Sequence, residues 1–221
     1  MAISAFAWFT IKRFWKDSNT LIETQREYYS FKRNGALFLS AIKSKRQIGL
    51  DSINTKYRIS FGDDDAAIKI TAVTNPLCGY CKEPFEVFDN LLSDESNSVQ
   101  VTYVFSTADD PENPGTEIST KIIALYAQNK QLAYEAMKDW YSNKDLEAWT
   151  EKYKGINTIM LAPKEALDAH RDWCETFNIM YTPETLINTY NYPSKEYKIT
   201  DLPLFLDEVK TLAEQGEEIL E

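Results

Sequence analysis

The chain has 221 residues, of which 43% are hydrophobic and 13% aromatic, enough to bury a sizeable core in one domain with an insertion or an added arm. Its seven glycines, eight prolines and lack of repeats exclude collagen-like, solenoid and disordered classes. The formal net charge of −10 argues against non-specific binding of nucleic acid, and the single histidine, His170, argues against triads or metal sites that need several histidines.

The N-terminal part of the chain is basic, whereas the rest is acidic. Through Arg46 there are nine Lys or Arg residues against three acidic ones, which gives this part a charge of +6 and leaves −16 for the remainder. The shift predicts a helical basic arm over residues 1–56, broken at Asn34-Gly35, ahead of an acidic domain over residues 57–221. We expect the arm to pack on the domain through aromatic side chains; the alternative is a juxtamembrane or oligomerisation segment. These aromatic side chains are Phe14, Trp15, Tyr28 and Phe31.

The first residues form neither a membrane span nor an ordinary export signal. Residues 2–9 are apolar apart from Ser4, far short of the roughly 20 apolar residues that a span needs. A signal peptide places its positive charges before the apolar run, whereas Lys12, Arg13 and Lys16 follow it here. We therefore expect either a cytoplasmic protein or a fragment of a longer one.

The domain alternates predicted strands and helices. Strands are predicted where β-branched and apolar residues alternate or run together, at residues 57–61, 68–73, 99–105, 185–188 and 197–199. Helices are predicted from apolar stripes in residues 82–92, where Pro84 should cause a kink or a restart, in residues 116–177 and in residues 202–212. This order predicts an α/β fold.

Two of the three cysteines form the sequence Cys78-Gly79-Tyr80-Cys81, between a predicted buried strand and a predicted helix. At a helix N-terminus, free N–H groups and the helix dipole favour the thiolate. Thiol pKa values in such pairs fall from about 8.5 to between about 3.5 and 7.5. Since the thiolate is the attacking species and the second sulfur can reach back, Cys78 is the predicted nucleophile and Cys81 the resolving thiol. Tyr80 lies between them, in a position to tune the redox potential.

Other interpretations of the pair stay open. It could supply half of a zinc site whose other ligands are His170 and Cys174, four residues apart on one predicted helix face. It could also be a static disulfide, or two buried thiols without a role. For Cys174 itself, we expect a small buried hydrophobic residue beside Trp173.

The stretch from Ile70 to Cys81 resembles the active-site entry of the thioredoxin superfamily, and Thr182-Pro183 resembles its cis-proline loop. About 100 residues with helical periodicity separate the two, which is similar to the helix-inserted disulfide oxidoreductases of the bacterial periplasm. The Cys-Gly-Tyr-Cys sequence is similar to that of the periplasmic disulfide isomerases. The resemblance covers about residues 57–212 and implies a thioredoxin fold with a helical insertion (116–177) between the second strand and the cis-proline loop.

Four motifs look closer still to the thioredoxin-like domains fused to bacterial vitamin K epoxide reductase homologues. They are Val73-Thr-Asn-Pro-x-Cys78, His170-x-x-Trp173-Cys174, Ile179-x-x-Thr-Pro183 and Tyr197-x-Ile-x-Asp-Leu202. In such fusions a membrane-embedded, quinone-linked domain exchanges electrons with the thioredoxin-like domain. This resemblance implies protein thiols or disulfides as substrates, no cofactor in this domain, and a periplasmic location with a membrane tether, or a cytoplasmic one if no span lies upstream.

The resemblance also implies roles for the residues around the sulfurs. The backbone of Thr182 would pair with an extended substrate segment, and Pro183 would shape the substrate groove and keep metals from the sulfurs. Gly79 and Tyr80 would complete the substrate-binding surface.

The sequence departs from the superfamily pattern close to the cysteine pair and close to the proline. Ala72 stands where thioredoxin has a buried carboxylate, six residues before the first cysteine, so deprotonation of Cys81 needs another route. Glu184 follows the proline, where we expect a smaller residue.

Overall fold

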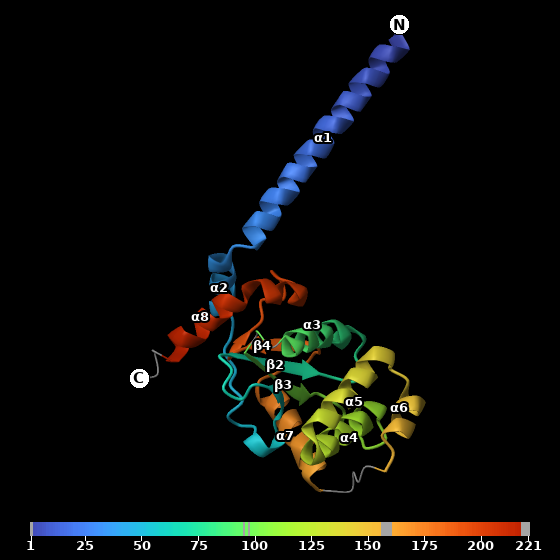
Figure 1. The fold of residues 1–221 in the computed structure, drawn as a ribbon, viewed down its shortest axis with the longest axis vertical. Coiled ribbons are helices and arrows are strands. Elements are labelled where there is room, and N and C mark those ends of the chain that lie inside the picture. The colour runs from blue at the N-terminus through green and yellow to red at the C-terminus, as the bar shows by residue number, and fades with distance from the viewer. Residues whose placement is uncertain (1, 95, 97, 156–160, 218–221) are drawn as a thin grey trace.

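The computed structural model describes residues 2–94, 96, 98–155 and 161–217 (Figure 1). Its strands form one mixed sheet in the order β1-β3-β2-β4-β5. Their bounds are β1 Ile59–Gly62, β2 Ile68–Thr74, β3 Val99–Phe105, β4 Glu184–Ile187 and β5 Tyr190–Asn191. Strands β2 and β3 are parallel, and the other neighbouring strands are antiparallel. The parallel pair lies in the middle of the sheet, which explains why its side chains are buried along almost the whole length of both strands.

Helices connect β2 to β3 and β3 to β4, and helices cover both faces of the sheet (Figure 1). Their bounds are α3 Lys82–Ser93, α4 Pro114–Gln128, α5 Lys130–Asn143, α6 Leu146–Lys152, α7 Leu161–Thr176 and α8 Leu206–Glu217, with 3₁₀ turns η1 Thr55–Tyr57, η2 Gly79–Cys81 and η3 Ile199–Phe205. Helices α4 to α7 lie between β3 and the Thr182-Pro183 loop, so the predicted α/β fold with a helical insertion is confirmed.

Two local predictions are wrong. Helix α3 is continuous from Lys82, because Pro84 lies in its first turn, where a missing N–H breaks no helical hydrogen bond. Residues 197–199 form no strand. There the carboxylate of Asp201 accepts a hydrogen bond from the Lys198 N–H, and this cap starts the 3₁₀ turn η3.

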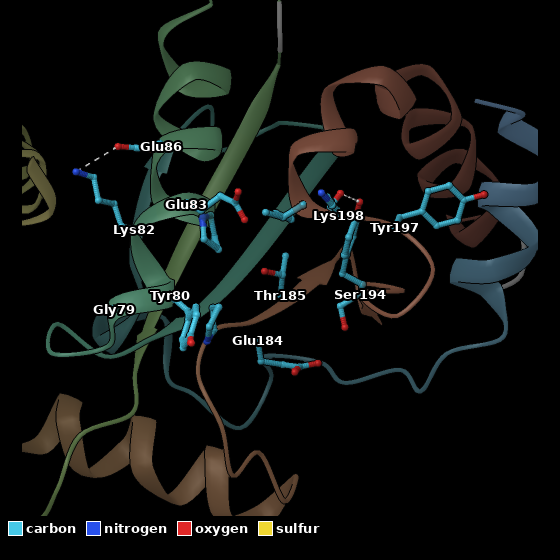
Figure 2. Close-up of a pocket in the computed structure, with 14 residues that line it drawn as sticks. Gly79, Tyr80, Lys82, Glu83, Glu86, Glu184, Thr185, Ser194, Tyr197 and Lys198 are labelled. Carbon is cyan, nitrogen blue, oxygen red and sulfur yellow. Dashed lines mark hydrogen bonds and ion pairs between the residues drawn. The ribbon is translucent and has the colours of Figure 1, made fainter. Parts of the chain in front are cut away.

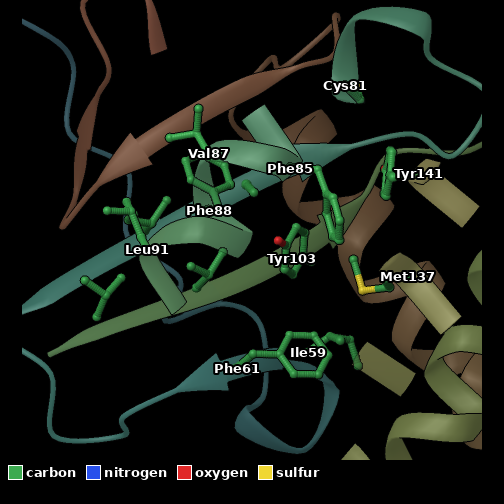
Figure 3. Close-up of a cluster of buried hydrophobic side chains, with 14 of the residues drawn as sticks. Ile59, Phe61, Cys81, Phe85, Val87, Phe88, Leu91, Tyr103, Met137 and Tyr141 are labelled. Atoms are coloured by element: carbon green, nitrogen blue, oxygen red, sulfur yellow. The ribbon is translucent and has the colours of Figure 1, made fainter. Parts of the chain in front are cut away.

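The core occupies both faces of the central strands. On one face, Phe85 of α3 stacks on Tyr141 of α5 with ring centroids 4.4 Å apart, and both lie near Cys81 at the start of α3 (Figure 3). On the other face, Trp173 of α7 joins a cluster with Val73 of β2. The end of β2 that leads to the cysteine pair is therefore held in place from both sides.

The predicted arm contains two different helices. Helix α1 (Ala2–Lys32) extends away from the domain (Figure 1). Its aromatic side chains Phe14, Trp15 and Phe31 are 72%, 69% and 65% exposed, so the prediction that they pack on the domain is wrong. Tyr28 is also exposed. Within the part of the chain that the structure describes, no helix combines the length and the apolar character that crossing a bilayer requires.

Helix α2 (Gly35–Lys43) belongs instead to the core of the domain. Asn34 caps its N-terminus, and Phe38 and Ile42 are completely buried. The Phe38 ring stacks on Phe205 at 4.3 Å between centroids. The packed domain thus begins near Gly35, whereas the charge pattern placed the boundary at residue 57.

Candidate active site

The loop after β2 places the cysteine pair at the start of α3. Asn75 fixes this loop: its side chain donates a hydrogen bond to the Ser106 carbonyl at 2.7 Å and accepts one from the Leu77 N–H at 2.9 Å. The Cys78 N–H donates to the Asn75 carbonyl at 3.0 Å. Cys78 is then the N-cap of η2, which continues directly into α3. Its sulfur therefore lies at a helix N-terminus, as predicted.

The two sulfurs have different environments. Cys78 is partly exposed, whereas Cys81 is only 2% exposed. Burial raises the pKa of Cys78, but hydrogen bonds from the side chains of Cys81 and Thr182 and from the backbone N–H groups of Tyr80 and Cys81 outweigh burial and lower the pKa overall. For Cys81, burial and the hydrogen bond to Cys78 raise the pKa. Cys78 is thus the thiol more readily ionised and more easily reached.

The Thr182-Pro183 loop lies against the cysteine pair. The Thr182–Pro183 peptide bond is cis. The Cys78 Sγ donates a hydrogen bond to the Thr182 carbonyl at 3.4 Å, and Pro183 lines a small cavity together with Cys81. The pairing of Val73 with Glu184 between β2 and β4 explains this proximity, because the loop immediately precedes β4.

An open groove of about 630 Å³ adjoins the pair (Figure 2). Predicted site residues Gly79, Tyr80 and Pro183 line it, and within it Lys82 forms an ion pair with Glu86 at 3.7 Å. A Cβ added to Gly79 would meet no heavy atom within 4 Å, so packing alone does not require glycine there.

Exposed apolar side chains lie in the two loops that meet at Cys78, and we call them the apolar border of the site. Leu77 and Tyr80 flank Cys78 in sequence and are 49% and 85% exposed. Met180 and Tyr181 precede the Thr182-Pro183 loop and are 70% and 84% exposed. Sequence patterns did not identify Leu77, Met180 or Tyr181, because an apolar residue in a loop carries no periodicity.

Glu184 is accommodated by the neighbouring strand. It is half-buried, and its carboxylate accepts a hydrogen bond from the Asn191 side chain of β5 at 2.8 Å. Burial raises the pKa of this carboxyl group. In the β2–β4 pairing Glu184 is opposite Val73, which packs in the cluster of Trp173 and α7. Its side chain therefore starts on the sheet face away from Cys81.

The zinc ligands considered from sequence are not brought together. His170 is fully buried on α7, where its Nδ1 accepts from the Phe105 N–H at 3.2 Å and its Nε2 bonds the Tyr57 carbonyl at 2.9 Å. Burial lowers the pKa of His170 to about 4. Cys174 lies in the cluster on the α7 side of the sheet, and burial raises its pKa to about 11. Among the described residues, no three His, Cys, Asp or Glu side chains are placed to hold a metal ion.

The structure adds three residues that the sequence did not identify as part of the site. The hydroxyl groups of Thr74 and Tyr141 are 2.6 Å apart, and the hydrogen bond from Thr74 to Cys81 acts to lower the pKa of that thiol. The Lys144 ammonium donates to the Cys78 carbonyl at 2.6 Å. Tyr141 stood out in the sequence only as part of a helical apolar stripe, and nothing in the sequence marked Lys144.

No protein-family model matches the sequence, and no curated protein matches it. Solved structures do match. The catalytic domain of Proteus mirabilis ScsC is similar with a TM-score of 0.61 at 15% identity, over 79% of this chain and 99% of that one. The thiol-disulfide exchange protein alpha-DsbA2 from Wolbachia pipientis is similar with a TM-score of 0.58 at 13% identity, over 79% and 97% of the two chains.

BdbD from Bacillus subtilis is similar with a TM-score of 0.55 at 14% identity, over 77% of this chain and 96% of that one. At such low identity these matches establish the architecture. Together with the strand order and the helices between β3 and the Thr182-Pro183 loop, they show that the chain has the thioredoxin fold with a helical insertion.

Proposed function

We propose that this protein is a thiol–disulfide oxidoreductase that acts on protein thiols and disulfides. The observation that carries the proposal is the asymmetric pair: a partly exposed Cys78 of lowered pKa at a helix N-terminus, beside a buried Cys81 of raised pKa. The similar structures support it, since one of them is described as a thiol-disulfide exchange protein.

The chemistry follows from this asymmetry. The Cys78 thiolate attacks one sulfur of a substrate disulfide, which breaks the substrate S–S bond, forms a mixed disulfide and releases the other substrate sulfur as a thiolate. The Cys81 thiol loses its proton, which ends on a released substrate thiolate, and its sulfur attacks the Cys78 sulfur, which forms the Cys78–Cys81 disulfide and releases the second substrate thiolate. The substrate gains two electrons and the protein loses two. Read backwards, the same steps oxidise a substrate dithiol.

We propose that the substrate is an extended polypeptide segment lying on the apolar border of the site. Leu77, Tyr80, Met180 and Tyr181 offer apolar contacts on both sides of the reactive sulfur. The backbone of Thr182 would pair with the segment, and Pro183 with Gly79 would shape the groove beside it. Exposed apolar segments are characteristic of incompletely folded proteins, which suits an enzyme acting on unfolded chains.

We also propose an extracytoplasmic location and a membrane-embedded, quinone-linked partner. The location is supported by a similar structure described as a periplasmic thioredoxin-like protein from Salmonella enterica serovar Typhimurium. It is also supported by redox chemistry, because disulfides form and persist in oxidising compartments. The partner is supported by the four motifs that resemble reductase-fused domains.

Trapping of the mixed disulfide tests the function. Cys81→Ala removes the resolving thiol, so we expect it to accumulate a covalent adduct with an unfolded disulfide-containing protein, resolved by dithiothreitol. Cys78→Ala should give no adduct. Wild-type protein that catalyses no exchange, or adducts that form equally through Cys81, would refute the proposal. Metal bound stoichiometrically after purification without chelator would favour the zinc-site alternative.

A further inference from the structure

We propose that Lys144, at the end of helix α5 in the insertion, is a positioning residue that holds the Cys78 backbone and stabilises the Cys78 thiolate. The inference rests on the proposed function, because it assigns a role in the same redox site. It gives the helical insertion a part in the chemistry.

The backbone at Lys144 is the first observation. Lys144 is the C-cap of α5, with φ 51° and ψ 32°, in the left-handed region. Helices often end in this conformation, but Gly or Asn usually provides it, since a Cβ is disfavoured there. A lysine is disfavoured in this backbone conformation, and its presence indicates that the lysine side chain has a function that offsets the cost.

The contact of the side chain is the second observation. The half-buried Lys144 extends to the active-site loop, where its Nζ donates a hydrogen bond of 2.6 Å to the Cys78 carbonyl. The same ammonium group lies over the Tyr141 ring, 5.5 Å from the ring centroid. Tyr141 is itself fixed by its stack on Phe85 (Figure 3). The lysine therefore reaches the backbone of Cys78 from a rigid support.

The cation is not neutralised by this contact, because its acceptor is a carbonyl and not a carboxylate. The titratable groups that interact with Cys78 from the packed elements are Cys81 and Tyr141, and burial raises the pKa of both, which keeps both neutral. On the groove side, Lys82 is paired with Glu86. Glu83 and Glu184 also line the groove. Lys144 thus brings a cation to the Cys78 backbone, whereas the groove is lined by these carboxylates.

A nearby cation favours the charged form of a thiol and lowers its pKa. For a partly exposed thiol we expect the low end of the usual range, about one pKa unit. Removal of the lysine should therefore raise the pKa of Cys78 by about one unit. At any pH well below the Cys78 pKa of both the wild type and the variant, this lowers the thiolate fraction about tenfold. At a pH above the Cys78 pKa of both the wild type and the variant, the reduced pair is about tenfold less favoured in the variant than in the wild type. This lowers the reduction potential of the variant by about 30 mV.

Substitution of Lys144 separates this role from a merely structural one. Lys144→Gly removes the charge and relieves the backbone, so it should not lower the melting temperature. Lys144→Met removes the charge but leaves the backbone as it is. We expect both to raise the Cys78 pKa, measured from thiolate absorbance and from the pH dependence of alkylation, while Lys144→Arg stays near wild type. Lys138→Met, on the same helix and paired with Asp89 at 2.9 Å, is the matched control.

The outcomes separate the two proposals. Wild-type protein that exchanges disulfides, together with Gly and Met variants whose Cys78 pKa is unchanged, overturns the role of Lys144 and leaves the proposed function standing. A shift of the same size in Lys138→Met also overturns it, since any cation on α5 would then suffice. Wild-type protein without exchange activity refutes the proposed function, whatever the pKa of the variants.

Discussion

The buried hydroxyl pair of Thr74 and Tyr141 should contribute both to stability and to the ionisation of Cys81. The two oxygens are 2.6 Å apart, and both residues are buried. Thr74→Val is nearly isosteric and leaves the Tyr141 hydroxyl buried without this partner, which costs about 1–3 kcal/mol. In a chain of this length that lowers the melting temperature by roughly 2–4 °C per kcal/mol. Tyr141→Phe keeps the stack on Phe85 and should cost only about 1 kcal/mol.

The two substitutions should not be additive. In the double variant neither hydroxyl remains, so its loss should be smaller than the sum of the single losses by about 1 kcal/mol. Urea unfolding of the reduced protein measures all four forms. Tyr103→Phe is the control, because the Tyr103 hydroxyl is buried and has no hydrogen-bond partner among the described residues, so removing it should cost nothing. Additive losses, or an equal loss in Tyr103→Phe, would refute the reasoning.

Three further predictions concern single residues. Iodoacetamide at pH 6 should modify Cys78 before Cys81, because the pKa of Cys78 is lowered and that of Cys81 raised; equal or reversed labelling contradicts the assignment. Cys174→Ala should lower stability by about 1 kcal/mol and leave exchange intact, and an activity loss at full stability would contradict a purely structural thiol. His170 has a pKa of about 4 when folded and about 6.5 when unfolded, so the unfolded chain binds protons more readily and stability falls as the pH drops from about 6.5 towards 4. Urea unfolding should show that the free energy of unfolding falls by about 2 kcal/mol between pH 7 and pH 5 in the wild type and not in His170→Gln. Equal losses in both proteins would exclude a lowered pKa of His170 as the cause.

The core strands and the cysteine pair were predictable because their signals are local. The run from Ile68 to Val73 is too apolar and β-branched for anything but a buried strand, and Cys78 follows it at the point where helical periodicity begins. The insertion was predictable as helical for the same reason. By contrast, the 3₁₀ turn after Tyr197 depends on a cap from Asp201, and a short apolar segment does not reveal such a cap.

The place of helix α2 was not predictable from charge. Phe38 and Ile42 form an i, i+4 pair, which shows that one face of the helix is apolar but not which surface it covers. Their partners include Phe205, more than 160 residues away in the sequence. The contact of Lys144 with Cys78 is also non-local, since it spans 66 residues of sequence. A lysine at a polar helix end has the same sequence pattern as any solvent-exposed lysine.

The groups that surround the cysteine pair in place of the missing carboxylate point to a direction of electron flow. A carboxylate at the position of Ala72, which lines the small cavity together with Cys81, would disfavour the Cys81 thiolate by like charge. Here β2 provides the neutral hydroxyl of Thr74 for Cys81 and α5 provides a cation for Cys78, and both kinds of group favour thiolates. Stabilising the thiolate stabilises the reduced pair, which makes the disulfide a stronger oxidant. We therefore expect the Cys78–Cys81 couple to have a reduction potential above the thioredoxin value of about −270 mV, towards the about −120 mV of strong oxidants. Equilibration with glutathione buffers measures it, and a potential at or below the thioredoxin value would contradict the argument.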